Sequence, residues 1–282
     1  MNVFHAQSQL QQFLKTEKTA TQTIGFVPTM GAIHNGHLSL MQRALNENDV
    51  VVMSIFVNPT QFNNAEDLDK YPRTLDRDVA LIASLSDKII VYAPTVEDIY
   101  EGNTVAQKFD YDGLENEMEG ANRPGHFDGV GTIVKKLFEI VQPNRAYFGE
   151  KDFQQLQIIR KMVEKAQMNI DIVGVPIYRQ QDGLAMSSRN ERLSEKAKAE
   201  SVYLSELLFS AQKLFSTAEV EQVLAFVQNE IRKRESFELE YFVIADEETL
   251  KTATKKEVGK KYRGFLVAHI EGVRLIDNIA LN

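Results

Sequence analysis

Residues 24–38 read IGFVPTMGAIHNGHL and carry the clearest indication of the fold class. Residues 24–28 form a short apolar run that predicts a buried strand, and residues 38–45 show the spacing of a helix that begins soon afterwards. Between them lies a turn that contains Gly31 and Gly36. A buried strand that leads through a glycine-containing turn into a helix is typical of a parallel α/β sheet.

The same alternation continues over the first 175 residues. Strands are expected at residues 49–56, 88–92, 146–148 and 170–175, and helices at residues 75–85, 129–141 and 153–166. Continuous apolar strands that alternate with helices predict a parallel sheet with helices on both faces. Because such sheets bind ligands at the carboxyl ends of their strands, we expect the functional residues in the loops after Val27, Phe56, Phe148 and Val175.

The pattern changes after residue 176. Helices are expected at residues 194–214 and 219–233, followed by strands at residues 239–245, 264–270 and 273–279. Strands grouped after helices are typical of an α+β domain. We therefore predict an α/β domain over residues 1–176 and a smaller α+β domain over residues 177–282. Residues 1–15 carry apolar side chains at helical spacing and are predicted to form an amphipathic helix.

Composition narrows the class of protein. The 282 residues include 32 Lys+Arg against 40 Asp+Glu, a net charge of −8, and no Cys. Without Cys the chain has no disulfide, thiolate metal site or cysteine nucleophile, and its acidic balance argues against nucleic-acid binding. The longest apolar run, residues 50–57, is far too short to span a membrane. Residues 1–15 also lack the pattern of an export signal, so we expect a cytoplasmic protein.

The first candidate site is the turn after the first strand, where His34 and His37 form a His-x-Gly-His motif. Two imidazoles three residues apart share one face of a helical turn and can donate hydrogen bonds to phosphate oxygens. The helix N-terminus behind them favours phosphate as well. Two alternatives remain: the histidines only cap the helix, or they bind a metal, for which no third ligand lies nearby in the sequence.

A second candidate is FGEKDFQQ at residues 148–155. Lys151 is a mobile cation that can neutralise a triphosphate, and Asp152 can cap the next helix, hold a ribose hydroxyl or bind magnesium. Gln155 lies one turn further on and can face the same cleft. The alternative is an ordinary helix start.

Two further candidates carry small polar groups. Residues 186–189, MSSR, offer two hydroxyls and a guanidinium for phosphate oxygens, or else form a capped loop before the helix near Ser194. Asn58 and Gln61 end the second strand and suit a substrate with hydroxyl and carboxyl groups, or else belong to an Asn-Pro turn.

Residues 71–78 read as an acidic helix N-terminus, and residues 123–130 as a mobile glycine-rich loop that enters a helix. Three absences are informative, since the sequence contains no P-loop motif, no Gly-x-Gly-x-x-Gly after the first strand and no Gly-x-Ser-x-Gly elbow. The chain therefore matches none of the usual sequence patterns of P-loop ATPases, dinucleotide oxidoreductases or Ser-His-Asp hydrolases.

Together these motifs resemble the pantothenate synthetase family, the pantoate–β-alanine ligases of the His-x-Gly-His nucleotidyltransferase superfamily. The matching segments, in order, are residues 27–37, 56–62, 71–74, 123–127, 148–155 and 186–189. The resemblance implies a Rossmann-like catalytic domain, a small C-terminal lid domain and a cytoplasmic homodimer. It also implies that pantoate is adenylated by ATP with Mg²⁺ and release of diphosphate, and that the adenylate reacts with β-alanine to give pantothenate and AMP.

The resemblance implies catalytic roles for His34, His37, Lys151 and Arg189. The general-acid role usually given to the position of His37 is interpreted here mainly as charge stabilisation of the leaving diphosphate. ATP contacts are implied for Met30, Gly31, Ala32, Ile33, His34, Asn35, Gly36, His37, Gly149, Glu150, Lys151, Asp152, Tyr178, Met186, Ser187, Ser188 and Arg189.

The same resemblance implies that Gln61, Gln155 and Asn58 hold the substrate, with Gln61 also linked to β-alanine. Asp78 matches an acidic position near magnesium and the phosphates. Tyr178 stands where a small aliphatic residue is common in the family, so a backbone contact to adenine survives there while the side-chain packing differs.

Two rival functions remain. A plain nucleotidyltransferase would stop after adenylyl transfer and need no amine, although Gln61 and Gln155 argue against it. A catalytically silent nucleotide-binding protein would bind ATP without forming AMP. Intact His34, His37 and Lys151 argue against that second rival.

Overall fold

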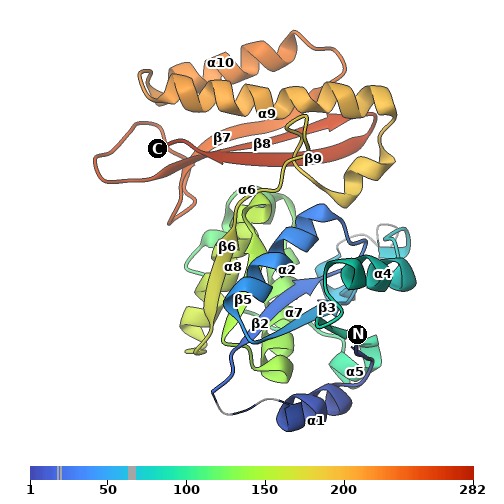
Figure 1. Cartoon of the computed structure of the whole chain (residues 1–282). Coiled ribbons are helices and arrows are strands. Elements are labelled where there is room, and N and C mark those ends of the chain that lie inside the picture. Colours follow the sequence, from blue (N-terminus) through green and yellow to red (C-terminus); the bar gives the residue numbers. More distant parts are fainter. Residues whose placement is uncertain (18, 20, 63–67) are drawn as a thin grey trace. The chain divides into compact units, whose positions relative to one another are not determined.

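The computed structural model describes residues 1–17, 19, 21–62 and 68–282. The chain divides into two units, Met1–Pro176 and Ile177–Asn282, which are described separately below. Element labels are those of Figure 1.

The first unit is built on a six-stranded parallel sheet with the strand order β1-β4-β3-β2-β5-β6. Its strands are β1 Val3–Phe4, β2 Ile24–Thr29, β3 Val50–Ile55, β4 Ile90–Tyr92, β5 Arg145–Gly149 and β6 Asp171–Val175. The predicted parallel α/β sheet is confirmed, with the expected strands displaced by only one or two residues at their ends. The chain leaves β2 for β3 on one side and returns to β5 on the other, so the carboxyl end of β2 lies at the switch in strand order.

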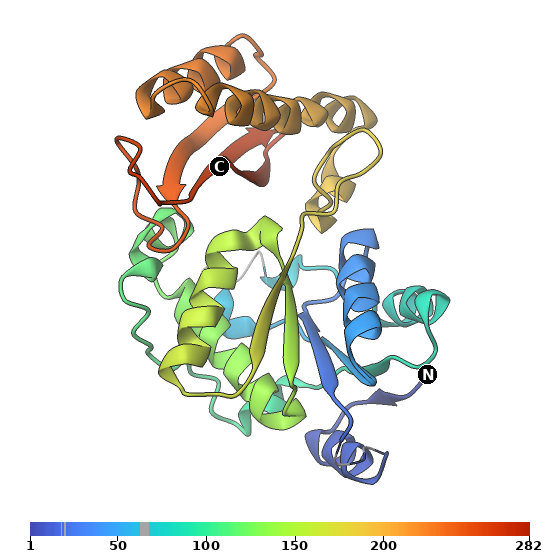
Figure 2. The same cartoon turned by 60° about the vertical axis from the view of Figure 1, so that its left-hand side comes forward.

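Helices cover both faces of this sheet, as Figures 1 and 2 show for α2 and α4 on one face and α7 and α8 on the other. Alternate strand residues point to opposite faces. Val27 and Met53 are buried beneath α2 and α4, whereas Phe26 and Phe148 pack against Phe138 of α7. The helices are α1 Gln7–Glu17, α2 Asn35–Glu47, α4 Leu75–Leu85, α5 Val96–Tyr100, α6 Met118–Asn122, α7 His126–Val141 and α8 Phe153–Lys165, with 3-10 turns η1 Pro59–Gln61, η2 Leu114–Asn116 and η3 Glu150–Asp152.

The N-terminal segment corrects one expectation. Residues 1–15 are not one helix, because Val3 and Phe4 form β1 and pair with β4 before α1 begins at Gln7. The backbone N–H of Ala93 donates to the carbonyl of Phe4 at 2.8 Å, which satisfies groups at the sheet edge. Local apolar spacing cannot reveal this pairing, because its partner lies almost ninety residues away.

The second unit places two helices on one face of a three-stranded antiparallel sheet of order β7-β8-β9 (Figures 1 and 2). Its elements are the 3-10 turn η4 Ser188–Arg192, α9 Glu195–Phe215, α10 Val220–Arg232, β7 Glu238–Asp246, β8 Tyr262–Ile270 and β9 Val273–Ala280. The core between helices and sheet includes Leu208, Val223 and Leu266, each without exposed surface. The predicted α+β character of this region is confirmed.

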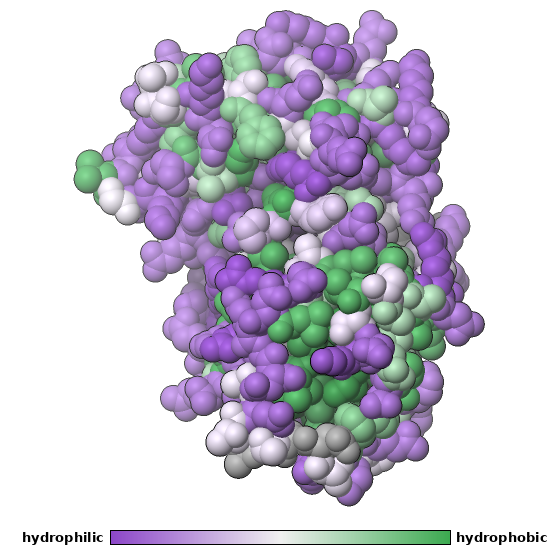
Figure 3. Space-filling view, in the orientation of Figure 1, coloured by the Kyte–Doolittle hydropathy of each residue, from purple (hydrophilic) through white to green (hydrophobic). Residues whose placement is uncertain are grey.

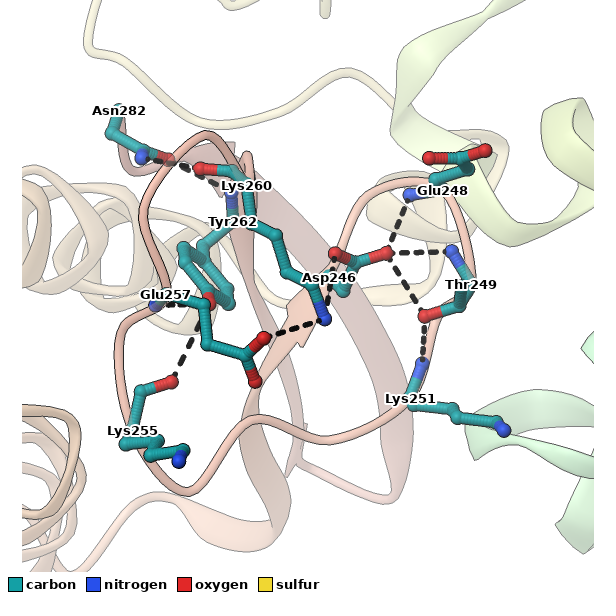
Figure 4. A network of polar contacts seen from close by, with 9 residues as sticks. All are labelled: Asp246, Glu248, Thr249, Lys251, Lys255, Glu257, Lys260, Tyr262 and Asn282. Atoms are coloured by element: carbon teal, nitrogen blue, oxygen red, sulfur yellow. Dashed lines mark hydrogen bonds and ion pairs between the residues drawn. The ribbon is translucent and has the colours of Figure 1, made fainter.

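A long, basic loop joins β7 to β8, and polar contacts order it (Figure 4). The Asp246 carboxylate accepts hydrogen bonds from the backbone N–H and hydroxyl of Thr249 at 2.8 and 2.9 Å. The Tyr262 hydroxyl accepts from the N–H of Glu257 at 2.8 Å, and Lys260 pairs with Glu257 at 3.3 Å. Its lysines lie mostly at the surface.

Within the ranges described, no helix combines the length and apolar character needed to cross a bilayer.

Candidate active site

The turn after β2 has a left-handed backbone at two consecutive residues. Gly31 has φ 85° and Ala32 has φ 51°. The Thr29 hydroxyl donates to the carbonyl of Ser54 at 2.8 Å and accepts from the N–H of Gly31 at 3.2 Å, which fixes the start of the turn. A Cβ on Gly31 would also lie only 3.1 Å from Cγ2 of Ile55, so both conformation and space require glycine.

His34 and His37 orient each other at the start of α2. Nδ1 of His34 accepts from the N–H of Gly36 at 3.1 Å, and Nδ1 of His37 accepts from the N–H of His34 at 3.3 Å. The two rings stack with centroids 4.0 Å apart. Since Nδ1 is an acceptor in both neutral rings, the ring proton resides on Nε2 in both. The two histidines do cap the helix, as the first alternative predicts. In the same arrangement each ring also has an Nε2–H group that can donate a hydrogen bond.

His37 is held in its neutral form. Burial, the neighbouring His34 and the charge of Lys151 lower the pKa of the His37 imidazole from 6.5 to about 3. At neutral pH the ring therefore carries no charge and acts as a hydrogen-bond donor. This supports the interpretation of charge stabilisation over that of a cationic general acid.

Lys151 reaches this region from a neighbouring strand. It lies in η3, which directly follows β5, and β5 pairs with β2 in the sheet. The electrostatic effect of Lys151 on His37 places the two motifs, more than one hundred residues apart in sequence, close together. Asp152 occupies the position before α8, but its side chain makes no capping hydrogen bond and is exposed.

Asn58 serves Gln61 rather than facing a ligand. Its side chain is 1% exposed, and its Oδ1 accepts from the hydroxyls of Tyr100 and Thr60 at 2.6 and 3.1 Å. Its Nδ2 donates to Oε1 of Gln61 at 3.2 Å and to the carbonyl of Gly129 at 3.1 Å. The expected direct substrate contact of Asn58 is therefore replaced by a supporting role, because both ends of its amide are used by the protein.

Gln61 and Met30 come together from the ends of β3 and β2. Nε2 of Gln61 lies 2.7 Å from the Sδ atom of Met30, and Gln61 is half-buried. Gln155 is also half-buried, on the first turn of α8. Its neighbour Gln154 is structural, since its amide donates to the carbonyls of Leu114 and Glu117 at 2.9 and 2.8 Å.

His126 is a supporting residue that the sequence interpretation left outside the site. Its Nδ1–H donates to the carbonyl of Gln61 at 2.9 Å, and its Nε2 accepts from Nη1 of Arg123 at 3.2 Å. Burial and the adjacent Arg123 lower its pKa from 6.5 to about 4. The sequence does carry a signal for it, because His126 lies in residues 123–127, one of the segments that resemble the family.

The expected mobile glycine-rich loop at residues 123–130 is helical from His126 onward, because α7 begins there. Of the two glycines in this segment, Gly129 is required by close packing. A Cβ at this position would lie 2.3 Å from the carbonyl oxygen of Thr60, so only glycine lets α7 approach η1 this closely.

Asp78 is buried under the turn and binds its backbone. Its carboxylate accepts from the N–H groups of Ala32 and Ile33 at 3.0 and 2.8 Å and from the Thr74 hydroxyl at 3.1 Å. The contact of Asp78 with magnesium stays a prediction, and the contacts present are those of a residue that holds the turn: three protein donors on a side chain that is 1% exposed. Among the residues described, no three His, Asp or Glu side chains are grouped as a metal site.

The second unit carries Tyr178 and the MSSR segment on a short hairpin. The N–H of Met186 donates to the carbonyl of Tyr178 at 3.0 Å, and the Tyr178 side chain is 40% exposed. The Ser187 hydroxyl caps η4 by accepting from the N–H of Arg189 at 3.3 Å, so its own proton remains for another acceptor. Met186, Ser188 and Arg189 are half-buried.

The hairpin is tied to β9 by a bidentate ion pair. Nη1 and Nη2 of Arg179 donate to the two oxygens of Asp277 at 2.7 and 2.9 Å. Cζ of Arg179 also lies over the ring of Phe209, 5.3 Å from its centroid. This pair fixes the base of the segment that carries residues 186–189.

Comparison with known proteins gives a consistent result. The family model described as pantoate-beta-alanine ligase matches residues 2–280. The pantothenate synthetase of Flavobacterium psychrophilum is 57% identical over 281 residues, covering 100% of both chains. The crystal structure of pantothenate synthetase from Thermus thermophilus has a TM-score of 0.90 and 40% identity, covering 100% of this chain and 99% of that one.

A third similar protein carries ligands. The crystal structure of pantoate-beta-alanine ligase from Francisella tularensis, complexed with beta-gamma ATP and beta-alanine, has a TM-score of 0.80 and 36% identity. It covers 100% of this chain and 98% of that one.

Proposed function

The chain belongs to the pantoate-beta-alanine ligase family, and from this premise we propose how its own residues carry the reaction. It is an enzyme that condenses pantoate with β-alanine at the expense of ATP. In the proposed first step a pantoate carboxylate oxygen attacks the α-phosphorus and diphosphate leaves. In the second, the β-alanine amine attacks the acyl carbon, AMP leaves, and the amine loses a proton to solvent.

The observation that carries this proposal is the pair of oriented imidazoles beside Lys151. In adenylyl transfer, negative charge grows on the bridging oxygen and the leaving diphosphate, so fixed donors aimed at that charge lower the barrier. The neutral His37 can donate from Nε2 throughout the physiological pH range, and Lys151 supplies the positive charge. Because their neighbours hold the rings in place, little reorganisation is needed.

Gln61 and Gln155 are proposed to hold the acid. Neutral amides can bind hydroxyl and carboxylate groups without the electrostatic repulsion that an acidic side chain would cause. Asn58 fixes Oε1 of Gln61, and His126 fixes its backbone. The amide end of Gln61 is therefore aimed by two buried residues before any substrate arrives.

The second unit is proposed to act as a lid that supplies the MSSR segment. Ser187, Ser188 and Arg189 can donate to phosphate oxygens, and Tyr178 can contact adenine through its backbone. Shielding the pantoyl adenylate from water would prevent its hydrolysis. The proposed domain roles are a catalytic domain over residues 1–176 and a lid domain over residues 177–282.

Magnesium is proposed to enter with ATP. Mg²⁺ takes oxygen ligands from phosphates and water and usually needs only one or two protein carboxylates. Because the oxygens of Asp78 accept from Ala32 and Ile33, we propose that Asp78 holds the turn rather than the ion. In this proposal His34, His37 and Lys151 contact the phosphates of ATP, and the magnesium ion neutralises part of the phosphate charge.

A cytoplasmic homodimer is also proposed. Figure 3 shows hydrophobic surface over the part of the first unit where α2 and α4 lie in Figure 1. Partly buried apolar residues of these helices include Leu38 and Leu45 on α2 and Leu75, Val79 and Leu81 on α4. An apolar patch of this kind favours a protein contact. Sedimentation equilibrium tests the dimer, and cell fractionation tests the location.

The decisive experiment measures AMP formation by the purified chain. AMP should form with ATP, Mg²⁺, pantoate and β-alanine together, and the product should contain an amide. Repeated turnover that releases an adenylylated product without any amine would favour a plain nucleotidyltransferase. ATP binding with no AMP under any of these conditions would favour a silent nucleotide-binding protein.

A further inference from the structure

We propose that Asp78 is a positioning residue for ATP binding, because it holds the backbone of residues 31–33 in the conformation that presents His34 and His37. The inference rests on the proposed function, since it concerns the same nucleotide site. It assigns Asp78 an action on the turn rather than on the ligand itself.

The contacts of Asp78 are all directed at the turn and at its own helix. Oδ2 accepts from the N–H of Ala32 at 3.0 Å, and Oδ1 accepts from the N–H of Ile33 at 2.8 Å. Oδ1 also accepts from the hydroxyl of Thr74 at 3.1 Å. The side chain is 1% exposed, so these donors rather than water solvate its carboxylate. Hydrogen bonds to a buried carboxylate are stronger than those between neutral groups.

Thr74 supports this arrangement at some cost to its own helix. It occupies the N-cap position of α4, where a threonine hydroxyl ordinarily accepts from the helix N-terminus. Here the side chain makes no capping hydrogen bond and donates to Asp78 instead. The start of α4 is thus organised around the carboxylate.

The turn needs such support because its backbone is strained. Ala32 adopts φ 51°, a left-handed conformation that L side chains disfavour, directly after Gly31 at φ 85°. Without an acceptor for the Ala32 and Ile33 N–H groups, the segment would relax toward right-handed conformations. The residue that follows is His34, whose ring orientation depends on the start of α2.

Glycine at position 31 makes the carboxylate's approach possible. A Cβ there would lie 3.0 Å from Oδ2 of Asp78, so a side chain at this position would push the carboxylate away from the turn. Asp78 and Gly31 therefore pack directly against each other. Replacing either residue should displace the turn and weaken ATP binding.

The test compares Asp78→Asn with Asp76→Asn, which removes the same charge from an exposed position on the same helical turn. An asparagine in place of Asp78 would turn an N–H₂ group toward one of the two backbone donors. We expect the Kd for ATP, measured by calorimetry, to rise about 10-fold or more in Asp78→Asn. The Kd for pantoate should change less than about two-fold, and Asp76→Asn should match the wild type.

Amide hydrogen exchange supplies a readout on the turn itself. The peptide covering residues 30–37 should exchange faster in Asp78→Asn and not in Asp76→Asn. Wild-type affinity for ATP, or equal weakening of ATP and pantoate binding, would overturn the proposal. So would a raised Mg²⁺ requirement with ATP affinity unchanged at saturating Mg²⁺, because that pattern belongs to a metal ligand.

Two milder variants keep the test decisive if Asp78→Asn does not fold. Thr74→Val removes one donor and leaves the carboxylate, and Gly31→Ala disturbs the contact from the other side. Both should weaken ATP binding selectively, and unchanged ATP affinity in both would reject the proposal. Failure of the wild type to make AMP would reject the proposed function, while these binding and exchange measurements would still decide the role of Asp78.

Discussion

Nδ1 of His37 accepts a hydrogen bond from the backbone N–H of His34 at 3.3 Å, and this contact determines which ring nitrogen carries the proton. With Nδ1 occupied, the neutral ring donates only from Nε2. The hydrogen bond that caps the start of α2 therefore also leaves Nε2 as the donor nitrogen of the His37 ring.

The two ring nitrogens of His37 can be tested separately. His37→Gln places an amide N–H₂ near the position of Nε2, whereas His37→Asn can keep only the acceptor near Nδ1. We expect the rate of pantoyl adenylate formation to fall about 100-fold or more in His37→Asn and less in His37→Gln. Rapid-quench measurement of diphosphate release with ATP and pantoate checks this, with circular dichroism as the control for folding. Equal rates for the two variants would contradict the assignment of Nε2.

The pH dependence of the adenylation rate should show no protonation of His37 above about pH 5. Its pKa is lowered to about 3, so the ring stays neutral as the pH falls from 8 to 5. The test is kcat/KM for ATP in wild type and His37→Gln over this range. An inflection near pH 6.5 that the variant abolishes would show that a charged imidazole takes part.

Lys151 should contribute through its charge rather than its shape. We expect Lys151→Met to lower the adenylation rate about 100-fold or more, and Lys151→Arg to retain part of it. The matched control is Lys161→Met on α8, since Lys161 pairs with Asp112 and Glu164 at the surface. A Lys151→Met variant as active as Lys161→Met would remove Lys151 from the mechanism.

His126 should make the fold sensitive to acid. Its pKa is about 4 when folded and about 6.5 when unfolded, so the unfolded chain binds the proton more readily. The stabilisation is therefore complete above pH 6.5 and is lost as the pH falls toward 4, by about 3 kcal/mol in total.

His126→Asn should flatten this pH dependence, because an amide can donate to the carbonyl of Gln61 without titrating. Urea denaturation at pH 7, 5.5 and 4.5 measures the difference in the free energy of unfolding. His5→Asn, at an exposed position, is the control. An unchanged slope in His126→Asn would show that other groups cause the acid sensitivity.

The buried ion pair Arg179–Asp277 should stabilise the second unit more than an exposed pair does. Its side chains are 18% and 5% exposed, against 23% and 28% for Arg274–Glu240. We expect Arg179→Met to lower the free energy of unfolding by about 3 kcal/mol, because Asp277 is left buried and unpaired. Arg274→Met should cost about 1 kcal/mol or less. Thermal unfolding of both variants measures the two losses in the free energy of unfolding. Equal losses would contradict the proposed effect of burial.

The strand and helix pattern could be predicted from the sequence because it is a local property. Residues 24–28 and 49–56 are continuous apolar runs, and β2 and β3 occupy nearly the same positions. The helix at residues 75–85 coincides with α4. Strands buried on both faces need apolar residues throughout, so the spacing alone identifies them.

The sequence predicted which kinds of side chain gather at the candidate site, but not which group each of them contacts. Asn58 and Asp78 were both expected to face ligands, and both are instead buried and bonded to other residues of the site. A sequence shows that an amide or carboxylate follows a strand. It does not show whether water, a ligand or a neighbouring backbone will satisfy it.

Local sequence patterns were enough to predict the parallel α/β sheet, the α+β character of the second unit and the set of polar groups at the carboxyl ends of the strands. Three contacts emerge only from the folded chain: Asp78 accepts from Ala32 and Ile33, His126 fixes Gln61, and β1 pairs with β4. Each of these contacts joins residues more than forty positions apart. Periodicity and local motifs depend on residues that are neighbours along the chain. These contacts and the lowered pKa of His37 depend instead on which elements lie side by side, and the order of the parallel strands sets that.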